Sequence, residues 1–166
     1  MNKYLTHLCH HFEGCELEAY LDGGNVATIG FGNTYYKDGS KVKLGDKITQ
    51  EEANKLFEYH IEEFTKGVLK LVEVSLEDYE VAALVSLAYN IGLGQFKGSN
   101  LLRYLNKGFY EEAAREFKWW RKDNGKIVDG LIRRRWSEER LFRGNTTNYI
   151  IYELPVNYMK YYGGGY

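Results

Sequence analysis

A glutamate, an aspartate and a threonine near the N-terminus have the types and the spacing for acid–base chemistry. Eight residues separate Glu13 from Asp22, and five separate Asp22 from Thr28. Glu13 ends a helical pattern, whereas Asp22 lies in a turn rich in glycine and asparagine between two short strand-like runs. The helix end, the turn and the second run can therefore bring two carboxyl groups and a hydroxyl to one rim. Hydrolysis of a glycosidic bond requires two such carboxyl groups: one protonates the leaving oxygen, and the other activates water or attacks the sugar carbon.

The two carboxyl groups would have different tasks. A general acid must keep its proton near neutral pH, so its pKa has to rise from an ordinary value of about 4.3 toward about 6, which partial burial in an apolar cleft can achieve. Glu13 could be this acid and Asp22 its ionised partner. From the residues alone, however, a helix-terminal glutamate in a surface ion pair is the ordinary interpretation of Glu13, and an aspartate favoured by the turn explains Asp22 equally well. Thr28, as a strand residue, needs no function.

Composition and charge are those of one ordinary globular domain. The chain has 166 residues, 44% of them hydrophobic and 27% charged, with a net charge of −1. No general attraction to nucleic acid or to an anionic membrane follows. Residues 44–96 carry an excess of acidic side chains and residues 97–143 an excess of basic ones. The basic half could face an anionic polymer such as cell-wall glycan, and two solvated helical faces of opposite sign explain it equally well.

The N-terminal segment and the two cysteines bear on where the protein is made. Histidines and Glu13 interrupt the N-terminal apolar residues, so we expect no signal peptide or membrane anchor and synthesis in the cytoplasm. Cys9 and Cys15 would not face one another across a helix end, and we expect no disulfide. Cys15 lies two residues from Glu13, so a redox-sensitive site is one interpretation, but a small buried hydrophobic side chain is the simpler one.

The pattern of apolar residues predicts a helix, a small sheet and a second, longer helix. Residues 3–13 have one apolar stripe at helical spacing, and Gly14 could end that helix in the left-handed conformation. Turns at residues 22–25 and 37–40 predict three antiparallel strands over residues 17–44. Thr49 and Glu52 form a capping box that predicts a long helix to about residue 71.

The remainder reads as a helical bundle. Residues 78–91 are apolar nearly all round, which is typical of the buried centre of a bundle. Glycines then interrupt the chain, and further helices are predicted after Ser99, over residues 110–121 and over residues 131–142. His7 and His11 have a spacing that can hold a metal, but without a third ligand in register we expect no metal site and no cofactor.

Several ordered segments resemble phage-type lysozymes, glycoside hydrolase family 24. The resemblance starts with the Glu13-x8-Asp22-x5-Thr28 spacing, preceded by Phe-Glu-Gly and followed by Ile-Gly-Phe-Gly. It continues through Ala83–Gly92, Leu101–Gly108 and Gly130–Arg135 with Glu138, so it spans roughly residues 3–143. The fold it implies is α+β and mainly helical, with a three-stranded sheet lobe over about residues 15–45. The helical lobe would cover about residues 70–143 plus helix 3–13, and residues 1–143 would be one catalytic domain.

The resemblance also implies a reaction and the residues that perform it. The substrate would be the β-1,4 bond between N-acetylmuramic acid and N-acetylglucosamine in peptidoglycan. Glu13 would be the acid and Asp22 its ionised partner, and Thr28 would help to place the attacking water, which makes the mechanism inverting. One of Arg133, Arg134 and Arg135, most simply Arg134, would pair with Glu13. Alternatively all three are solvated or pair with the glutamates that follow them.

Three more residues fall where the family places glycan contacts, namely Tyr89, Asn90 and Ser99. Core packing explains Tyr89 equally well, and helix capping explains Ser99. The sequence departs from the family at Asn33, where many members have histidine, so an ion pair built on that histidine is not expected here.

Residues 144–166 form a tyrosine-rich C-terminal tail that the resemblance does not reach. We expect the tail to pack on the domain rather than to offer an aromatic surface to a partner. We expect a monomer that acts on the cell wall after the membrane is permeabilised, and the resemblance implies a holin for that delivery. Two other functions stay open: a lytic transglycosylase on the same substrate, and a non-catalytic glycan-binding component of a virion.

Overall fold

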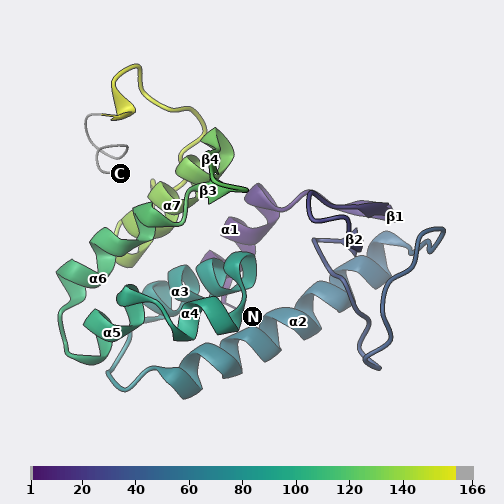
Figure 1. Ribbon diagram of the computed structural model, residues 1–166. Coiled ribbons are helices and arrows are strands. Elements are labelled where there is room, and N and C mark those ends of the chain that lie inside the picture. Colours follow the sequence, from purple (N-terminus) through teal and green to yellow (C-terminus); the bar gives the residue numbers. More distant parts are fainter. Residues whose placement is uncertain (1, 160–166) are drawn as a thin grey trace.

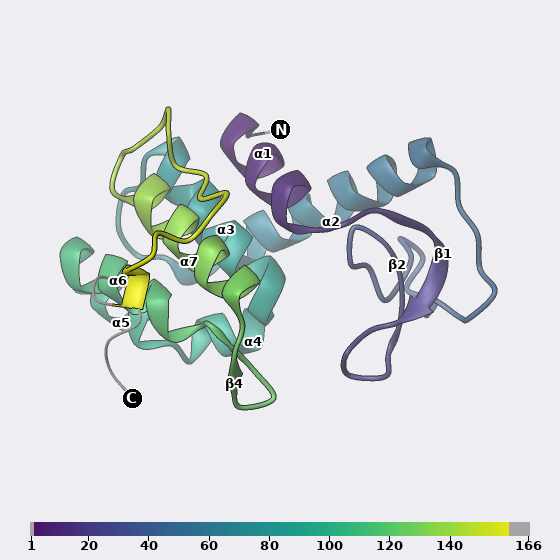
Figure 2. The ribbon, with the colours of Figure 1, turned by 90° about the horizontal axis from the view of Figure 1, so that it is seen from above.

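One long helix joins a helical lobe to a small sheet lobe (Figures 1 and 2). The computed structural model describes residues 2–159. After α1 (Lys3–Phe12), the sheet lobe holds β1 (Glu16–Leu21) and β2 (Ala27–Gly30), and α2 (Gln50–Leu71) runs back to the helical lobe. The helical lobe continues with α3 (Asp78–Ile91), α4 (Leu93–Lys97), α5 (Asn100–Asn106), α6 (Tyr110–Glu116), the 3₁₀ helix η1 (Phe117–Trp119), β3 (Lys122–Asp123), β4 (Lys126–Ile127) and α7 (Asp129–Phe142). The mainly helical α+β class predicted from the sequence is confirmed.

Helix α1 begins and ends through local backbone chemistry. The side chain of Asn2 caps it by accepting a hydrogen bond from the backbone N–H of Tyr4 (3.0 Å). The helix buries Leu5 and Leu8 and ends at Phe12. Glu13 is already extended (φ −92°, ψ 122°), which directs the chain toward β1. The expected left-handed stop at Gly14 is therefore wrong.

The sheet lobe contains two paired strands, so the expected three-stranded sheet over residues 17–44 is also wrong. β1 pairs antiparallel with β2. Residues 46–48 lie along the other edge of β1, held by two backbone hydrogen bonds of 2.9 Å, and form only an isolated bridge. Residues 41–44 instead fold back on the preceding loop, because the turn at Gly39 (φ 84°) reverses the chain there.

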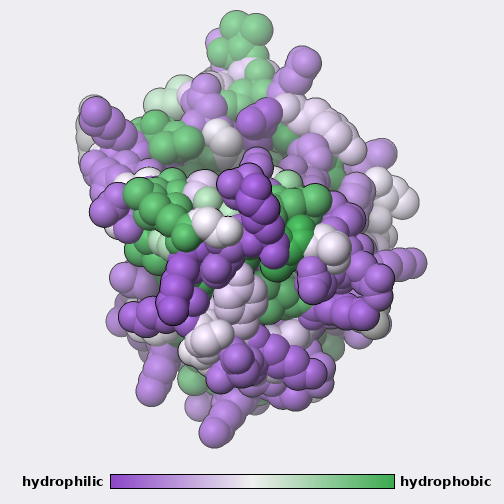
Figure 3. All heavy atoms as spheres, turned by 90° about the vertical axis from the view of Figure 1, so that its right-hand side faces the viewer, coloured by the Kyte–Doolittle hydropathy of each residue, from purple (hydrophilic) through white to green (hydrophobic). Residues whose placement is uncertain are grey.

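Helix α2 serves both lobes. Thr49 and Glu52 form the predicted capping box at its start. Leu56 packs in a small cluster with Ala19 and Ile29 of the sheet lobe, whereas its neighbour Phe57 belongs to the main core. Figure 3 views the molecule from the sheet-lobe side, where apolar atoms form separate patches among hydrophilic ones.

The helical lobe is built around α3, whose residues 82–88 are all buried. α7 and α1 pack against α3, and α2 covers another side. The predicted helix over residues 110–121 is shorter than expected, since it becomes 3₁₀ at Phe117, and α7 starts two residues earlier than predicted. Within residues 2–159, no helix combines the length and the apolar character needed to cross a membrane.

The tail crosses the outer face of α7 and α1 (Figure 2). Tyr149 is buried, and its hydroxyl lies 2.7 Å from Nδ1 of His7. The backbone N–H of Ile151 donates to Ser137 Oγ (2.8 Å). The last tyrosines of the tail, Tyr161, Tyr162 and Tyr166, lie outside the described residues.

Candidate active site

Glu13 lies where α1 gives way to the sheet lobe, and residues from two other elements fix its carboxylate. Oε1 accepts a hydrogen bond from Nη1 of Arg134 on α7. Oε2 lies against Gly32, where an added Cβ would be 3.4 Å away. Gly32 has φ +86°, a conformation that favours glycine, so the loop after β2 can approach Glu13 this closely. The Glu13 side chain keeps 18% of its surface exposed.

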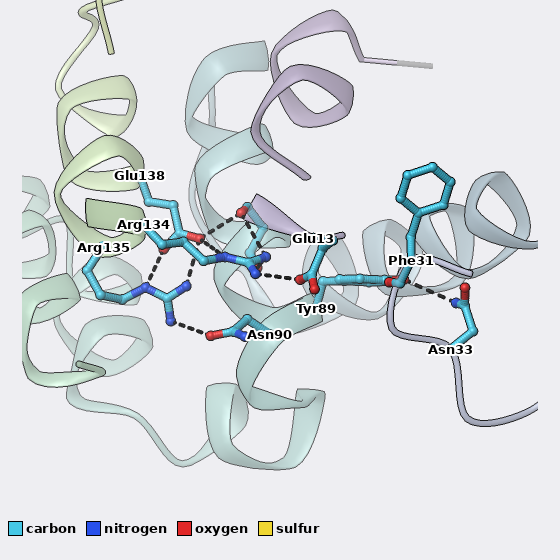
Figure 4. A network of polar contacts seen from close by, with 9 residues as sticks. Glu13, Phe31, Asn33, Tyr89, Asn90, Arg134, Arg135 and Glu138 are labelled. Atoms are coloured by element: carbon cyan, nitrogen blue, oxygen red, sulfur yellow. Dashed lines mark hydrogen bonds and ion pairs between the residues drawn. The ribbon is translucent and has the colours of Figure 1, made fainter. Parts of the chain in front are cut away.

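A buried network of two arginines and a second glutamate supports Glu13 (Figure 4). The Glu138 side chain has no exposed surface, and its Oε1 accepts from Arg134 Nε (3.2 Å) and from Arg135 Nη2 (2.9 Å). The same oxygen accepts from the Ser86 hydroxyl (2.6 Å). Burial lowers the pKa of Arg134, but the negative charges of Glu13 and Glu138 together raise it by more. The pKa therefore lies above its ordinary value. Glu138 thus links Arg134 to Arg135 beneath Glu13.

The three successive arginines point in three directions. Arg134 faces Glu13 and Glu138, whereas Arg135 also donates to Asn90 Oδ1 (2.9 Å). Arg133 donates from Nη1 to the backbone carbonyl of Tyr152 in the tail (2.8 Å). Of the three arginines, Arg134 is therefore the one that pairs with Glu13, as the family resemblance implied.

Asp22 and Thr28 lie on the hairpin of the sheet lobe. Oδ1 of Asp22 accepts from the backbone N–H groups of Gly24 (2.9 Å) and Val26 (2.8 Å), which fixes the turn. Thr28 is buried, is paired across the hairpin with Tyr20, and donates from Oγ1 to the Val26 carbonyl (3.0 Å).

The pKa of Tyr20, on β1, is shifted by burial and by the acidic side chains of this part of the chain. Burial raises the pKa of Tyr20, and the charges of Glu13 and Asp22 raise it further. Ala19 and Ile29 direct the opposite face of the hairpin toward α2, so Tyr20 and Thr28 share the other face. Glu13, Asp22 and Thr28 thus come from three successive pieces of chain: the end of α1, the turn after β1, and β2.

Tyr89 joins the two lobes behind Glu13. Its hydroxyl donates to the Phe31 carbonyl (2.8 Å) and accepts from Asn33 Nδ2 (3.1 Å). The ring of Phe31 in turn stacks on His10, with centroids 4.7 Å apart. Asn33 is buried, and its hydrogen bond to Tyr89 joins two neutral groups.

Asn90 and Ser99 line a groove that leads away from Glu13. A cavity of about 390 Å³ contains Glu13, Asn90 and Arg133 in its wall. It shares Asn90 with a cavity of about 640 Å³ beside Trp119 and Trp120, which leads to a third of about 550 Å³ beside Ser99. The Ser99 hydroxyl accepts from the Leu102 N–H (3.1 Å) and donates to the Phe96 carbonyl (2.7 Å), so it caps α5.

The β3–β4 hairpin faces the turn that holds Asp22. A Cβ built on Gly23 would lie 3.8 Å from Oδ2 of Asp123, so the two lobes come close together at this point.

The sequence did not reveal this close approach of the two hairpins, nor the roles of Ser86 and Gly32. Only Glu138 left a signal, because it follows Arg134 and Arg135 at helical spacing, which is also the spacing of ordinary surface pairs.

The thiols and histidines do not form a further reactive centre. Burial raises the pKa of Cys9 to about 12, which keeps it a thiol, and both cysteines are free. Across residues 2–159, no three His, Cys, Asp or Glu side chains gather in a way that could hold a metal ion.

Comparison with known proteins gives one consistent family. The family model described as phage lysozyme matches residues 10–138. The endolysin of Bacillus phage B103 is 42% identical over 137 residues, which cover 81% of this chain and 51% of that protein. The chain therefore spans about half the length of this relative.

Solved structures agree with the sequence match. An endolysin from Escherichia coli O157:H7 phage FAHEc1 has a TM-score of 0.74 and 36% identity, covering 86% of this chain and 91% of that one. The muramidase domain of SpmX from Asticaccaulis excentricus also has a TM-score of 0.74, with 31% identity, covering 84% of this chain and 95% of that one.

Proposed function

This chain belongs to the phage lysozyme family, and from that premise we propose that it is an endolysin muramidase that hydrolyses bacterial peptidoglycan. The bond cleaved is the β-1,4 link between N-acetylmuramic acid and N-acetylglucosamine, and the outcome is lysis of the host cell. One observation carries the proposal: the Glu13 carboxyl lies in the wall of an open cavity, held by Arg134, beside the hairpin that bears Asp22.

Glu13, Asp22 and Thr28 each have a role in the proposed reaction. Protonated Glu13 gives its proton to the glycosidic oxygen, and a water attacks the anomeric carbon from the opposite face of the sugar. Asp22 stays ionised and either accepts a proton from that water or stabilises the positive charge that develops on the sugar. The Thr28 hydroxyl turns from the Val26 carbonyl to orient the water. The anomeric configuration is inverted.

The glycan would lie along the groove that begins at Glu13. Asn90 is exposed in two adjoining cavities, so its amide is the best placed of the three expected contacts to meet a sugar. Tyr89 supports the wall behind Glu13, since its hydroxyl bonds join the lobes. Ser99 shapes the far end of the groove as the cap of α5.

Delivery follows from the proposed activity. The protein would be made in the host cytoplasm as a monomer, and a holin would open the membrane so that it reaches the wall.

Replacement of Glu13 by glutamine tests the acid. The amide oxygen can still accept from Arg134, which also keeps the carboxylate of Glu138, so the melting temperature should change little. The rate of wall clearing should fall at least about 100-fold. Glu16→Gln, three residues on and exposed on β1, is the matched control and should keep full activity. A Glu13→Gln variant that clears walls at the normal rate would remove Glu13 from the mechanism.

The products distinguish the remaining possibilities. Mass spectrometry should find muropeptides with ordinary reducing ends, and NMR of the first product should find the inverted anomer. Anhydro products, lighter by one water, would identify a lytic transglycosylase instead. Binding to walls without release of reducing ends would identify a glycan-binding protein.

A further inference from the structure

Arg133 differs from the two arginines that follow it. Arg134 and Arg135 are buried and each lies within 4.0 Å of a glutamate carboxylate. Arg133 is half-buried, and no carboxylate among the described residues comes within ion-pair distance of it. Its charge is therefore not neutralised by the part of the chain that the structure describes.

The guanidinium of Arg133 has hydrogen-bonding capacity to spare. A guanidinium group has five N–H donors. Within residues 2–159, Arg133 uses one of them, since Nη1 donates to the Tyr152 carbonyl (2.8 Å). Nε is shielded from solvent and has no partner in the described structure. Nη2 lies over Gly130, 3.9 Å from where a Cβ on that glycine would be.

Arg133 lines the same cavity as Glu13. In that cavity the charge of Arg134 is matched by Glu13 and Glu138, so Arg133 supplies the unmatched positive charge at its wall. Asp129, one helical turn earlier, is the nearest acidic residue on the same face of α7, and its carboxylate is instead approached by the Tyr158 hydroxyl (3.4 Å). A ligand in the cavity therefore meets a guanidinium that lacks an anion.

We propose that Arg133 is a specificity-determining residue that binds a carboxylate of the substrate next to the reacting sugar. This inference rests on the proposed function and deepens it. The glycan backbone of peptidoglycan is uncharged where its muramic acid carries a peptide, so the carboxylates available are those of the stem peptide. Where the peptide has been removed, the free lactyl carboxylate of muramic acid is available instead. Arginine binds both with charge-assisted hydrogen bonds.

The tail takes part in this recognition by holding Arg133 in place. The Tyr152 carbonyl occupies Nη1, and the Tyr152 ring packs edge-on against His11, another residue of the cavity wall, with centroids 4.9 Å apart. Arg140 is held in a similar way, because its Nε and Nη2 donate to the Asn148 carbonyl (3.1 and 2.7 Å). Arg140, however, is not in the wall of this cavity.

Arg133→Gln and Arg140→Gln therefore form a matched pair. Each removes one positive charge and the side-chain hydrogen bonding to one tail carbonyl, but only the first removes a charge from the cavity. With intact peptidoglycan, Arg133→Gln should lower kcat/KM about tenfold, mainly through KM, the effect of losing a charge-assisted hydrogen bond. Arg140→Gln should change it less than about twofold, and Arg133→Lys should recover part of the loss.

Chemically altered walls show whether a carboxylate is what Arg133 binds. Walls whose carboxylates have been converted to amides should be cleaved equally by the original protein and by Arg133→Gln. Walls treated with an amidase keep only the lactyl carboxylate. If the original protein still cleaves these walls faster than Arg133→Gln does, the lactyl carboxylate is the group bound. If the two proteins cleave them equally, the group bound is a carboxylate of the stem peptide. Equal losses for Arg133→Gln on intact and amidated walls, or equal losses for Arg133→Gln and Arg140→Gln, would overturn the proposal.

Sedimentation with intact and amidated walls separates this proposal from the proposed function. Binding needs no catalysis, so Arg133→Gln should bind intact walls more weakly than Arg140→Gln does, whether or not any bond is cleaved. If this difference is found without hydrolysis, the proposed function fails and carboxylate binding stands. If hydrolysis is found without this difference, the role of Arg133 fails and the proposed function stands.

Discussion

Replacing Glu138 by glutamine should destabilise the protein far more than the same change one residue later, at Glu139. Glu138 has no exposed side-chain surface and is the acceptor shared by Arg134, Arg135 and the Ser86 hydroxyl. Glutamine keeps the size of the side chain but removes its charge. The buried guanidinium groups of Arg134 and Arg135 would then both lose the carboxylate that they share.

The size of the effect follows from burial. Removing one partner of a buried ion pair costs about 3–5 kcal/mol, and a domain of this length loses about 2–4 °C of melting temperature per kcal/mol, so the midpoint should fall by roughly 6–20 °C. Glu139 instead pairs with Arg143, and these side chains are 15% and 29% exposed. Removing a pair of this partly solvated kind costs about 1 kcal/mol or less, which is a few degrees.

Thermal and urea unfolding of the two variants, followed by circular dichroism at neutral pH, measure this difference. Wall-clearing activity at a temperature where both variants are folded gives a second readout. Glu138→Gln should also be slower there, because Arg134 would lose one of the groups that aim it at Glu13. Equal midpoints for the two variants would show that the buried network contributes little, and the reasoning from burial would be wrong.

Three further outcomes are expected. Gly32→Ala should lower both the melting temperature and the activity, whereas Gly39→Ala, which has the same positive φ but nothing within 4 Å of an added Cβ, should lower only the melting temperature. Burial holds the pKa of His60 below its usual 6.5, so near that pH the native state binds fewer protons than the unfolded state. Stability should therefore be full above pH 6.5 and should fall as the pH drops below it. His60→Gln should flatten a plot of melting temperature against pH. A thiol reagent should modify half-buried Cys15 in the folded protein, as counted by mass spectrometry. It should modify Cys9 only after unfolding, because that thiol is buried and its pKa is raised to about 12. Rapid double labelling of the native protein would contradict the burial of Cys9.

Local chemistry in the sequence predicted much of the framework. The capping box at Thr49 fixes the start of α2 because its two hydrogen bonds are made within four residues. The apolar character all round residues 78–91 predicted the buried helix for the same reason, since burial on every side leaves no polar stripe. Such features need no knowledge of the rest of the fold.

Features that depend on distant segments could not be predicted. The partner of Arg133 is a tail carbonyl 19 residues later, and a backbone carbonyl leaves no mark on the sequence. The third strand was misplaced because residues 41–44 alternate polar and apolar side chains as a strand does, whereas the turn at residues 43–46 brings residues 46–48 to β1 instead. Spacing could suggest that Glu138 pairs with arginines, but not that the pairs are buried, which decides their importance.

The position of α2 has a consequence for how the molecule comes apart. Leu56 and Phe57 are consecutive on this helix, yet they belong to different apolar clusters, and Ile48 touches both. Melting the middle of α2 would therefore remove packing from both lobes in one step. The two lobes should unfold together as a single cooperative unit, and a fragment that carries only the sheet lobe should not keep its structure alone.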